Sequence, residues 1–61
     1  DLKNKLSYTI AILDGFNNGL LLTTIYGRES CITYAKEVNA GIVNQELSKE
    51  EYEALRMALE K

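Results

Sequence analysis

Three segments of the chain carry the alternation of side chains that is typical of β-strands. Residues 6–13 (LSYTIAIL) are rich in β-branched and aromatic side chains and largely alternate between bulky and small positions, which predicts a strand. Similar composition predicts a second strand at about residues 20–27 and a third at about 31–38. Together the three segments predict an antiparallel β-meander.

Turn-forming residues separate the predicted strands. Asp14-Gly15 and Asn18-Gly19 are both hairpin-turn dipeptides and stand between the first two strands. Residues 27–30 (GRES) favour a tight turn before the third strand. Ile42-Val43, after a break at residues 39–41, is a candidate for a short fourth strand. We therefore expect a sheet of three or four strands.

The end of the chain predicts a helix at about residues 49–61. Ser48 is a typical N-cap, and Glu51 three residues later completes a capping box. Leu47, before the cap, is placed to pack against Tyr52. The apolar stripe expected to face the sheet consists of Tyr52, Leu55, Ala58 and Leu59. The predicted fold is α+β, with one C-terminal helix packed on one face of the sheet.

The parity of the loops predicts which side chains share a face. A first loop of either two or six residues pairs odd positions with even ones, and a two-residue turn at Arg28-Glu29 does the same in the second hairpin. The bulky face, expected to pack against the helix, then consists of Tyr8, Ile10, Ile12, Leu21, Thr23, Ile25, Ile32 and Tyr34. The opposite face holds mainly small and polar residues, with a cluster of Leu13, Leu20, Leu22 and Tyr26.

This distribution leaves apolar side chains on both faces of the sheet, although one short helix covers only one face. Either the chain folds Phe16 or Ile42-Val43 over the second face, or another protein covers it. The second alternative predicts an interface at Leu13, Leu20, Leu22 and Tyr26, used by a protein partner or a second copy.

Composition limits the classes of function. The chain has 61 residues, a formal net charge of −2, a single cysteine (Cys31) and no histidine. One domain of this length is near the lower limit for an independent core. We expect no internal disulfide, no structural zinc and no cofactor. The acidic balance argues against nucleic acid, no apolar run is long enough to span a membrane, and an unpaired cysteine fits the cytoplasm.

Few residues suggest chemistry. Cys31 has no histidine to activate it and is expected to be a small apolar filler. Glu50, Glu51 and Glu53 are explained by their position at the positive end of the helix. The remaining candidate is Arg28, whose guanidinium in a tight turn is suited to binding a small anion, and the residues expected to assist it are Tyr26, Tyr34 and Lys36. An enzyme is not expected.

Five blocks of the sequence carry a resemblance to a known family. They are residues 6–8 (LSY), 11–14 (AILD), 18–29 (NGLLLTTIYGRE), 34–36 (YAK) and 47–51 (LSKEE). In order and spacing they resemble the C-terminal domain of an uncharacterised bacterial protein family, a domain of unknown function. The family's blocks centre on Asp14, Asn18, Gly19, Gly27, Arg28, Tyr34 and Lys36.

The resemblance implies a longer parent protein, with one N-terminal membrane anchor, a coiled-coil segment and this domain on the cytoplasmic side. An extended stretch that usually precedes the domain in that family is not recognised here, and Glu37 stands where the family has a proline. If that stretch is a strand, an open edge remains for another copy. We expect a non-catalytic interaction or self-assembly module, with a small-anion or metabolite sensor at Arg28 as the alternative.

Overall fold

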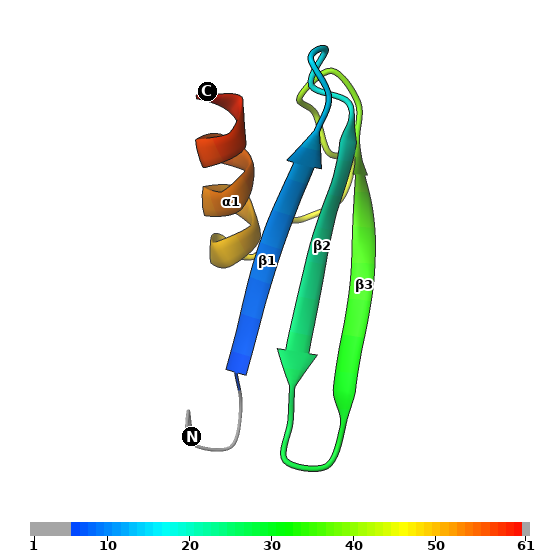
Figure 1. The fold of residues 1–61 in the computed structure, drawn as a ribbon, viewed down its shortest axis with the longest axis vertical. Coiled ribbons are helices and arrows are strands. Elements are labelled where there is room, and N and C mark those ends of the chain that lie inside the picture. Colours follow the sequence, from blue (N-terminus) through cyan, green and yellow to red (C-terminus); the bar gives the residue numbers. More distant parts are fainter. Residues whose placement is uncertain (1–5, 61) are drawn as a thin grey trace.

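The structure is a computed structural model that describes residues 6–60, with three strands and one helix (Figure 1). The strands β1 (Leu6–Leu13), β2 (Gly19–Tyr26) and β3 (Cys31–Val38) form one antiparallel sheet in the order β1-β2-β3, followed by α1 (Lys49–Leu59). The predicted α+β meander with a C-terminal helix is confirmed. Residues 1–5 and 61, which belong to the predicted single domain at 1–61, lie outside the described range.

The segment proposed as a fourth strand does not join the sheet. Ile42 makes only an isolated bridge with Asn39, in a tight turn where Ala40 and Gly41 both have positive φ angles. The side chain of Asn18 accepts a hydrogen bond from Ala40 N at 2.7 Å, and Asn17 O accepts one from Gly41 N at 2.9 Å. These bonds attach the turn after β3 to the loop between β1 and β2.

The loop between β1 and β2 is held by an aspartate side chain. Asp14 Oδ1 accepts hydrogen bonds from the backbone N–H groups of Phe16, at 2.8 Å, and Asn18, at 3.0 Å. Asn17 adopts the left-handed conformation with φ 67°, which asparagine tolerates better than most residues. The loop therefore comprises residues 14–18.

Gly19 belongs to β2 and not to the turn. It pairs with Leu13, and a Cβ at this position would lie 1.8 Å from Ile12 O. A side chain there would collide with the neighbouring backbone, so the pairing depends on glycine. The result is a five-residue loop, and the predicted loop of two or six residues is wrong.

The loop length decides which face of the sheet each side chain of β1 occupies. Ile10 pairs with Leu22 and Ile12 with Leu20, so even positions of β1 and β2 share a face. In the second hairpin Leu22 pairs with Ala35, so odd positions join even ones there, as predicted. Tyr8, Ile10 and Ile12 consequently lie on the face away from the helix, and Leu13 lies on the helix side. Both placements correct the sequence-based faces.

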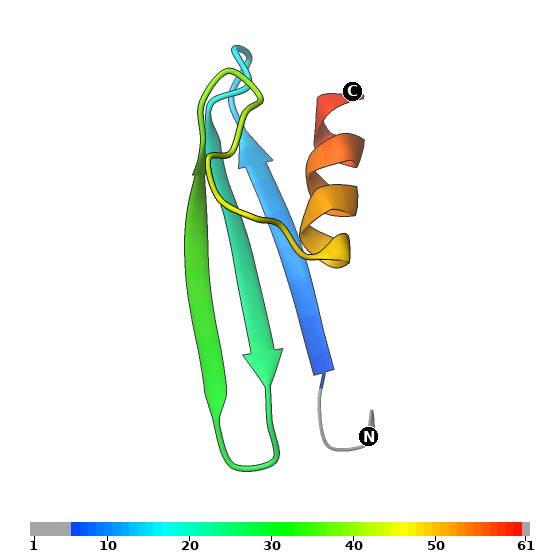
Figure 2. The same ribbon diagram turned by 180° about the vertical axis from the view of Figure 1, so that it is seen from behind.

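The core lies between the helix and the upper part of the sheet. Its buried residues are Leu21, Val38 and Leu55, and the partly buried residues packed against them are Ala11, Leu13, Val43, Leu47 and Ala54. Figure 2 shows the segment between β3 and α1 crossing over β2 and β3 on this side. Phe16 and Ile42 are 81% and 61% exposed, and Val43 packs against the core on the helix side. The alternative in which Phe16 or Ile42-Val43 covers the second face is therefore wrong.

The helix is rotated relative to the predicted stripe. The capping box is present: Ser48 Oγ accepts a hydrogen bond from Glu51 N at 3.1 Å, and Glu51 Oε1 accepts one from Ser48 N at 2.9 Å. Leu55 faces the core as expected, but Tyr52 is exposed and Glu51 is only 1% exposed. The helix therefore presents a carboxylate to the sheet at the position next to the predicted tyrosine.

Candidate functional site

The face of the sheet away from the helix, called here the open face, is built from four rows that run across the three strands. Strand pairing places in these rows Leu6-Tyr26-Cys31, Tyr8-Thr24-Thr33, Ile10-Leu22-Ala35 and Ile12-Leu20-Glu37. Side chains are large along β1 and, apart from Glu37 at one corner, small along β3. The open face is therefore a ridge beside a shallow strip, and it carries a single formal charge.

Large apolar side chains on the open face are accessible to solvent. The exposed ones are Leu6, Tyr8, Ile10, Ile12, Leu20 and Tyr26. Figure 1 looks onto this face, and among the described segments none crosses in front of the strands. At roughly 200 Å² for each large side chain, six residues that are about half exposed present on the order of 600 Å². That is the upper end of the largest apolar patch on a typical monomer.

Aromatic and hydroxyl side chains of the open face contact one another. The rings of Tyr8 and Tyr26 are 6.1 Å apart with a 44° tilt. Thr24, which lies between Tyr8 and Thr33 in their row, is buried, and its hydroxyl lies 3.0 Å from that of Thr33. Interaction with the Tyr8 hydroxyl raises the pKa of Tyr26 above its ordinary value of 10.0, so Tyr26 is uncharged at neutral pH.

On the helix side, the most buried ionisable group is Glu51. Its Oε2 accepts a hydrogen bond from Thr23 Oγ1 at 2.7 Å, and its Oε1 accepts one from Lys36 Nζ at 2.8 Å. Burial alone would raise the pKa of Glu51, but the bonds from Lys36, the Ser48 backbone and Thr23, with the Lys36 charge, lower the pKa from 4.5 to about 2. The carboxylate stays ionised at neutral pH, where it is too weak a base for proton transfer.

The Glu51 carboxylate connects every element of the fold. Because Thr23 uses its single hydroxyl proton on Glu51, Thr9 must donate to Thr23 across their 3.0 Å separation. Lys36 also donates to Glu46 O at 2.6 Å. The cluster thus joins β1, β2 and β3 to the helix and to the segment that precedes it. Its groups are occupied by each other, which assigns it a structural role.

The four residues considered for an anion site do not converge. Tyr34 and Lys36 are close, with Lys36 Nζ 5.7 Å from the centre of the Tyr34 ring, and both lie on the helix side of the sheet. Tyr26 lies on the open face, and Arg28 is in the turn between β2 and β3. Lys36 is bound to Glu51. These positions do not assemble a single binding site from the four side chains.

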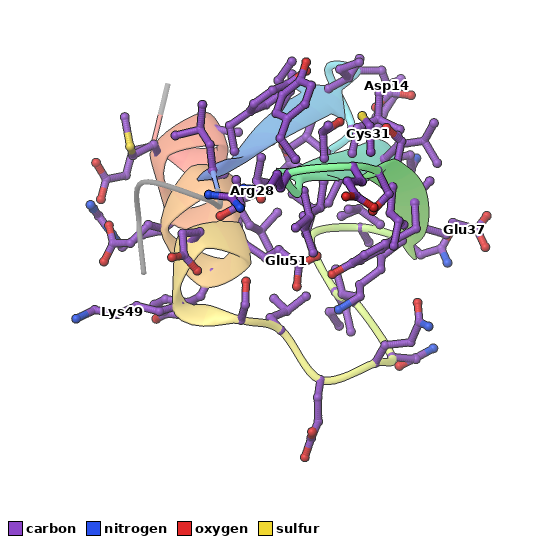
Figure 3. The ribbon with its side chains drawn as sticks, turned by 90° about the horizontal axis from the view of Figure 1, so that it is seen from below. Asp14, Arg28, Cys31, Glu37, Lys49 and Glu51 are labelled. Carbon is purple, nitrogen blue, oxygen red and sulfur yellow. The ribbon has the colours of Figure 1, made fainter. Side chains whose placement is uncertain are left out.

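The predicted interface residues lie on two different faces of the sheet because of the loop length. Leu20, Leu22 and Tyr26 lie together on the open face, and Leu13 is on the helix side. Tyr8, Ile10 and Ile12 belong to the same open surface. The sequence pattern predicts them on the other face, because only the number of loop residues decides their side. Figure 3, which looks along the strands, shows Glu51 and Cys31 on opposite sides of the sheet.

Other chemistry is sparse in the part of the chain that the structure describes. Cys31 is exposed at the start of β3, which corrects its expected role as a buried filler. Residues 6–60 contain no group of three or more Cys, Asp or Glu side chains placed to hold a metal ion. Within the same range, no helix is long and apolar enough to cross a membrane.

Comparison with known proteins identifies a family without an assigned activity. Residues 1–59 match the family described as "Protein of unknown function (DUF4446)". Neither a curated protein nor a solved structure matches the chain. The match covers nearly the whole sequence.

Proposed function

We propose, from the premise that this chain belongs to the DUF4446 family of proteins of unknown function, that it is a non-catalytic docking module that binds protein through its open face. The single observation behind this proposal is the exposed apolar surface made by Leu6, Tyr8, Ile10, Ile12, Leu20 and Tyr26. Exposed apolar surface of this extent is a feature of interaction sites on soluble proteins.

The shape and chemistry of the open face support protein as the bound class. The face is a sheet surface whose side chains are uncharged apart from Glu37, and two tyrosines lie together on it. Tyrosine is enriched among residues that dominate binding energy, because a large apolar ring and a hydroxyl act together. A face with one acidic group, Glu37, offers no attraction to a phosphate backbone.

The family resemblance extends this proposal to the parent protein. In it, the module stands on the cytoplasmic side of a membrane-anchored chain and brings a partner to that position. The anchor and the coiled coil are proposed for the parent protein only. The docking activity of the open face does not depend on them.

Site-specific photo-crosslinking in cells that express the full native protein tests the docking role. A photoreactive amino acid replaces Ile10, on the open face, or Met57, which is 64% exposed on the outer side of the helix. Adducts are expected from position 10 and not from position 57, because only the first lies in the proposed site. Absence of any adduct from position 10, or equal yields from both positions, would refute the docking role.

A further inference from the structure

We infer that the partner of the open face is a second copy of this chain, packed face to face so that β1 of each copy lies over β3 of the other. This inference rests on the proposed docking role and names its partner. It follows from three properties of the open face: its area, its single charge at the rim and the gradient of side-chain size across its strands.

The available area is sufficient for a stable pair. Six half-exposed residues present on the order of 600 Å² per copy, and burying both surfaces removes about 1,200 Å², the lower bound of a standard-size interface. Leu22 is partly exposed, and Cys31, Thr33 and Ala35 are exposed beside these residues, so the contact extends beyond the six. A stable dimer therefore needs no surface outside the open face.

The charge distribution permits two copies to meet at this face. The chain carries a formal charge of −2, which disfavours self-association at most surfaces. On the open face the charge is confined to Glu37, in the end row with Leu20 and Ile12. Two copies that meet at the open face bury neutral side chains at the centre and leave this carboxylate at the rim, where it remains hydrated.

The gradient of side-chain size selects one arrangement. Two sheets that pack face to face around a two-fold axis have two simple choices. An axis along the strands places β1 over the partner's β3, whereas an axis across the strands places β1 over β1. In the first choice the large residue of β1 meets a small one in three of the four rows, as where Tyr8 meets Thr33 and Ile10 meets Ala35. In the end row, Ile12 meets Glu37 at the rim. The second choice sets the large side chains of β1 against those of the partner's β1 and leaves the small side chains of the two β3 strands facing each other across a gap.

The same rows keep the central strand in contact. Leu22 lies on β2 between Ile10 and Ala35, so an axis along the strands brings Leu22 of one copy against Leu22 of the other. The two sheets then form an aligned sandwich with a separation of about 10 Å. Each copy contributes the same residues, as a closed two-fold interface requires.

Sedimentation velocity of the purified protein tests the pairing. We expect a species of twice the 6.9 kDa chain mass at concentrations of about 100 μM and above. Leu22→Lys should restore the monomer, because a buried ammonium at the centre of the interface lacks a partner. Met57→Lys, the same charge on the outer side of the helix, should leave the dimer unchanged. A wild-type protein that stays monomeric at about 500 μM overturns the inference.

A size-swap experiment tests the arrangement of the strands. Ile10→Ala and Ala35→Ile should each weaken the dimer at least tenfold, the first by a cavity and the second by crowding. The double variant exchanges the large and small positions, and its dimer should recover to within about threefold of the wild type. Ile10 and Ala35 are separated by β2 within one chain, so they touch only between copies. Additive weakening in the double variant overturns the β1-over-β3 arrangement.

Separate control experiments distinguish a folding defect from a docking defect. Ile10 and Ala35 are exposed in a single copy, so the circular dichroism spectra of their variants should match that of the wild type. If a spectrum changes, the same size swap is made with Tyr8→Ala and Thr33→Leu. A monomeric pure protein combined with heavier adducts from position 10 in cells refutes the second copy but supports docking. Absent adducts in cells refute docking itself.

Discussion

Replacement of Glu51 by glutamine tests the buried carboxylate as the main polar connection between the helix and the sheet. The substitution keeps the size of the side chain and one oxygen to accept hydrogen bonds from Lys36 or Thr23. It removes the negative charge, so the Lys36 ammonium, 2.8 Å from Oε1 and only 15% exposed, remains without a counter-charge. Breaking one member of a buried pair is costly because the other stays buried.

The magnitude follows from the pKa of Glu51. Its fall from 4.5 to about 2 on folding corresponds to about 3 kcal/mol of stability contributed by the ionised form. The folded-state pKa is the lower one, so this contribution is present above pH 4.5 and is lost as the pH falls toward 2. Roughly half of it is lost by pH 3. A domain of this size has a total stability of about 3–5 kcal/mol, so the loss is a large share of it.

Urea unfolding followed by circular dichroism measures this contribution at pH 7, 5, 4 and 3. Glu51→Gln should be less stable than the wild type by about 3 kcal/mol at pH 7. The difference between the two proteins should shrink to roughly half at pH 3, since the wild-type carboxyl group is then almost fully protonated in the unfolded state but still mostly ionised in the folded state. Glu50→Gln makes the same chemical change on an exposed neighbour in the first helical turn and should cost less than about 1 kcal/mol.

A difference that stays constant from pH 7 to pH 3 would refute the reasoning, as would a loss below about 1 kcal/mol at pH 7. If Glu51→Gln does not fold, Thr23→Val provides a smaller perturbation. It removes one donor to the carboxylate and should cost about 1.5–3 kcal/mol, the usual value for a hydrogen bond to a charged group.

Three further substitutions test the turn, the cap and the core by thermal or urea unfolding at neutral pH. Gly19→Ala should unfold the domain or cost more than about 3 kcal/mol, because its Cβ would meet Ile12 O at 1.8 Å; a loss under about 1 kcal/mol contradicts this. Ser48→Ala should cost about 1 kcal/mol through the lost cap bond to Glu51 N, and an unchanged midpoint would show that the cap bond is dispensable. Leu21→Ala should cost about 2–5 kcal/mol, since Leu21 is fully buried; a tolerated change would place the core elsewhere.

The small core explains why both the Glu51 cluster and the open face matter to this chain. Only Leu21, Val38 and Leu55 are buried hydrophobic residues in the described part of the chain. The sheet continues past the helix toward the turn between β2 and β3 (Figure 1), so this end of the sheet has no helical cover. Apolar burial inside one copy is therefore limited, and the proposed pairing through the open face would add to it.

Local sequence determined the elements of this protein. Side-chain alternation places β3 at the predicted residues 31–38, and Ser48 with Glu51 starts the helix at Lys49 as predicted. These features depend on neighbouring residues: period-two patterning indicates a strand, and a hydroxyl residue three positions before a glutamate indicates a capping box. They can be recognised without knowing what packs against them.

Tertiary structure decided which side of each element is covered. The face of β1 depends on a loop of five residues instead of two or six, and that count follows from Asp14 binding the N–H groups of Phe16 and Asn18 and from the close approach of Gly19 to Ile12 O. A change of one residue in the loop exchanges the two faces. Likewise, the sequence shows Glu51 only as a member of the capping box. The fold brings Lys36 and Thr23 to its carboxylate, because residues far apart in sequence meet through packing.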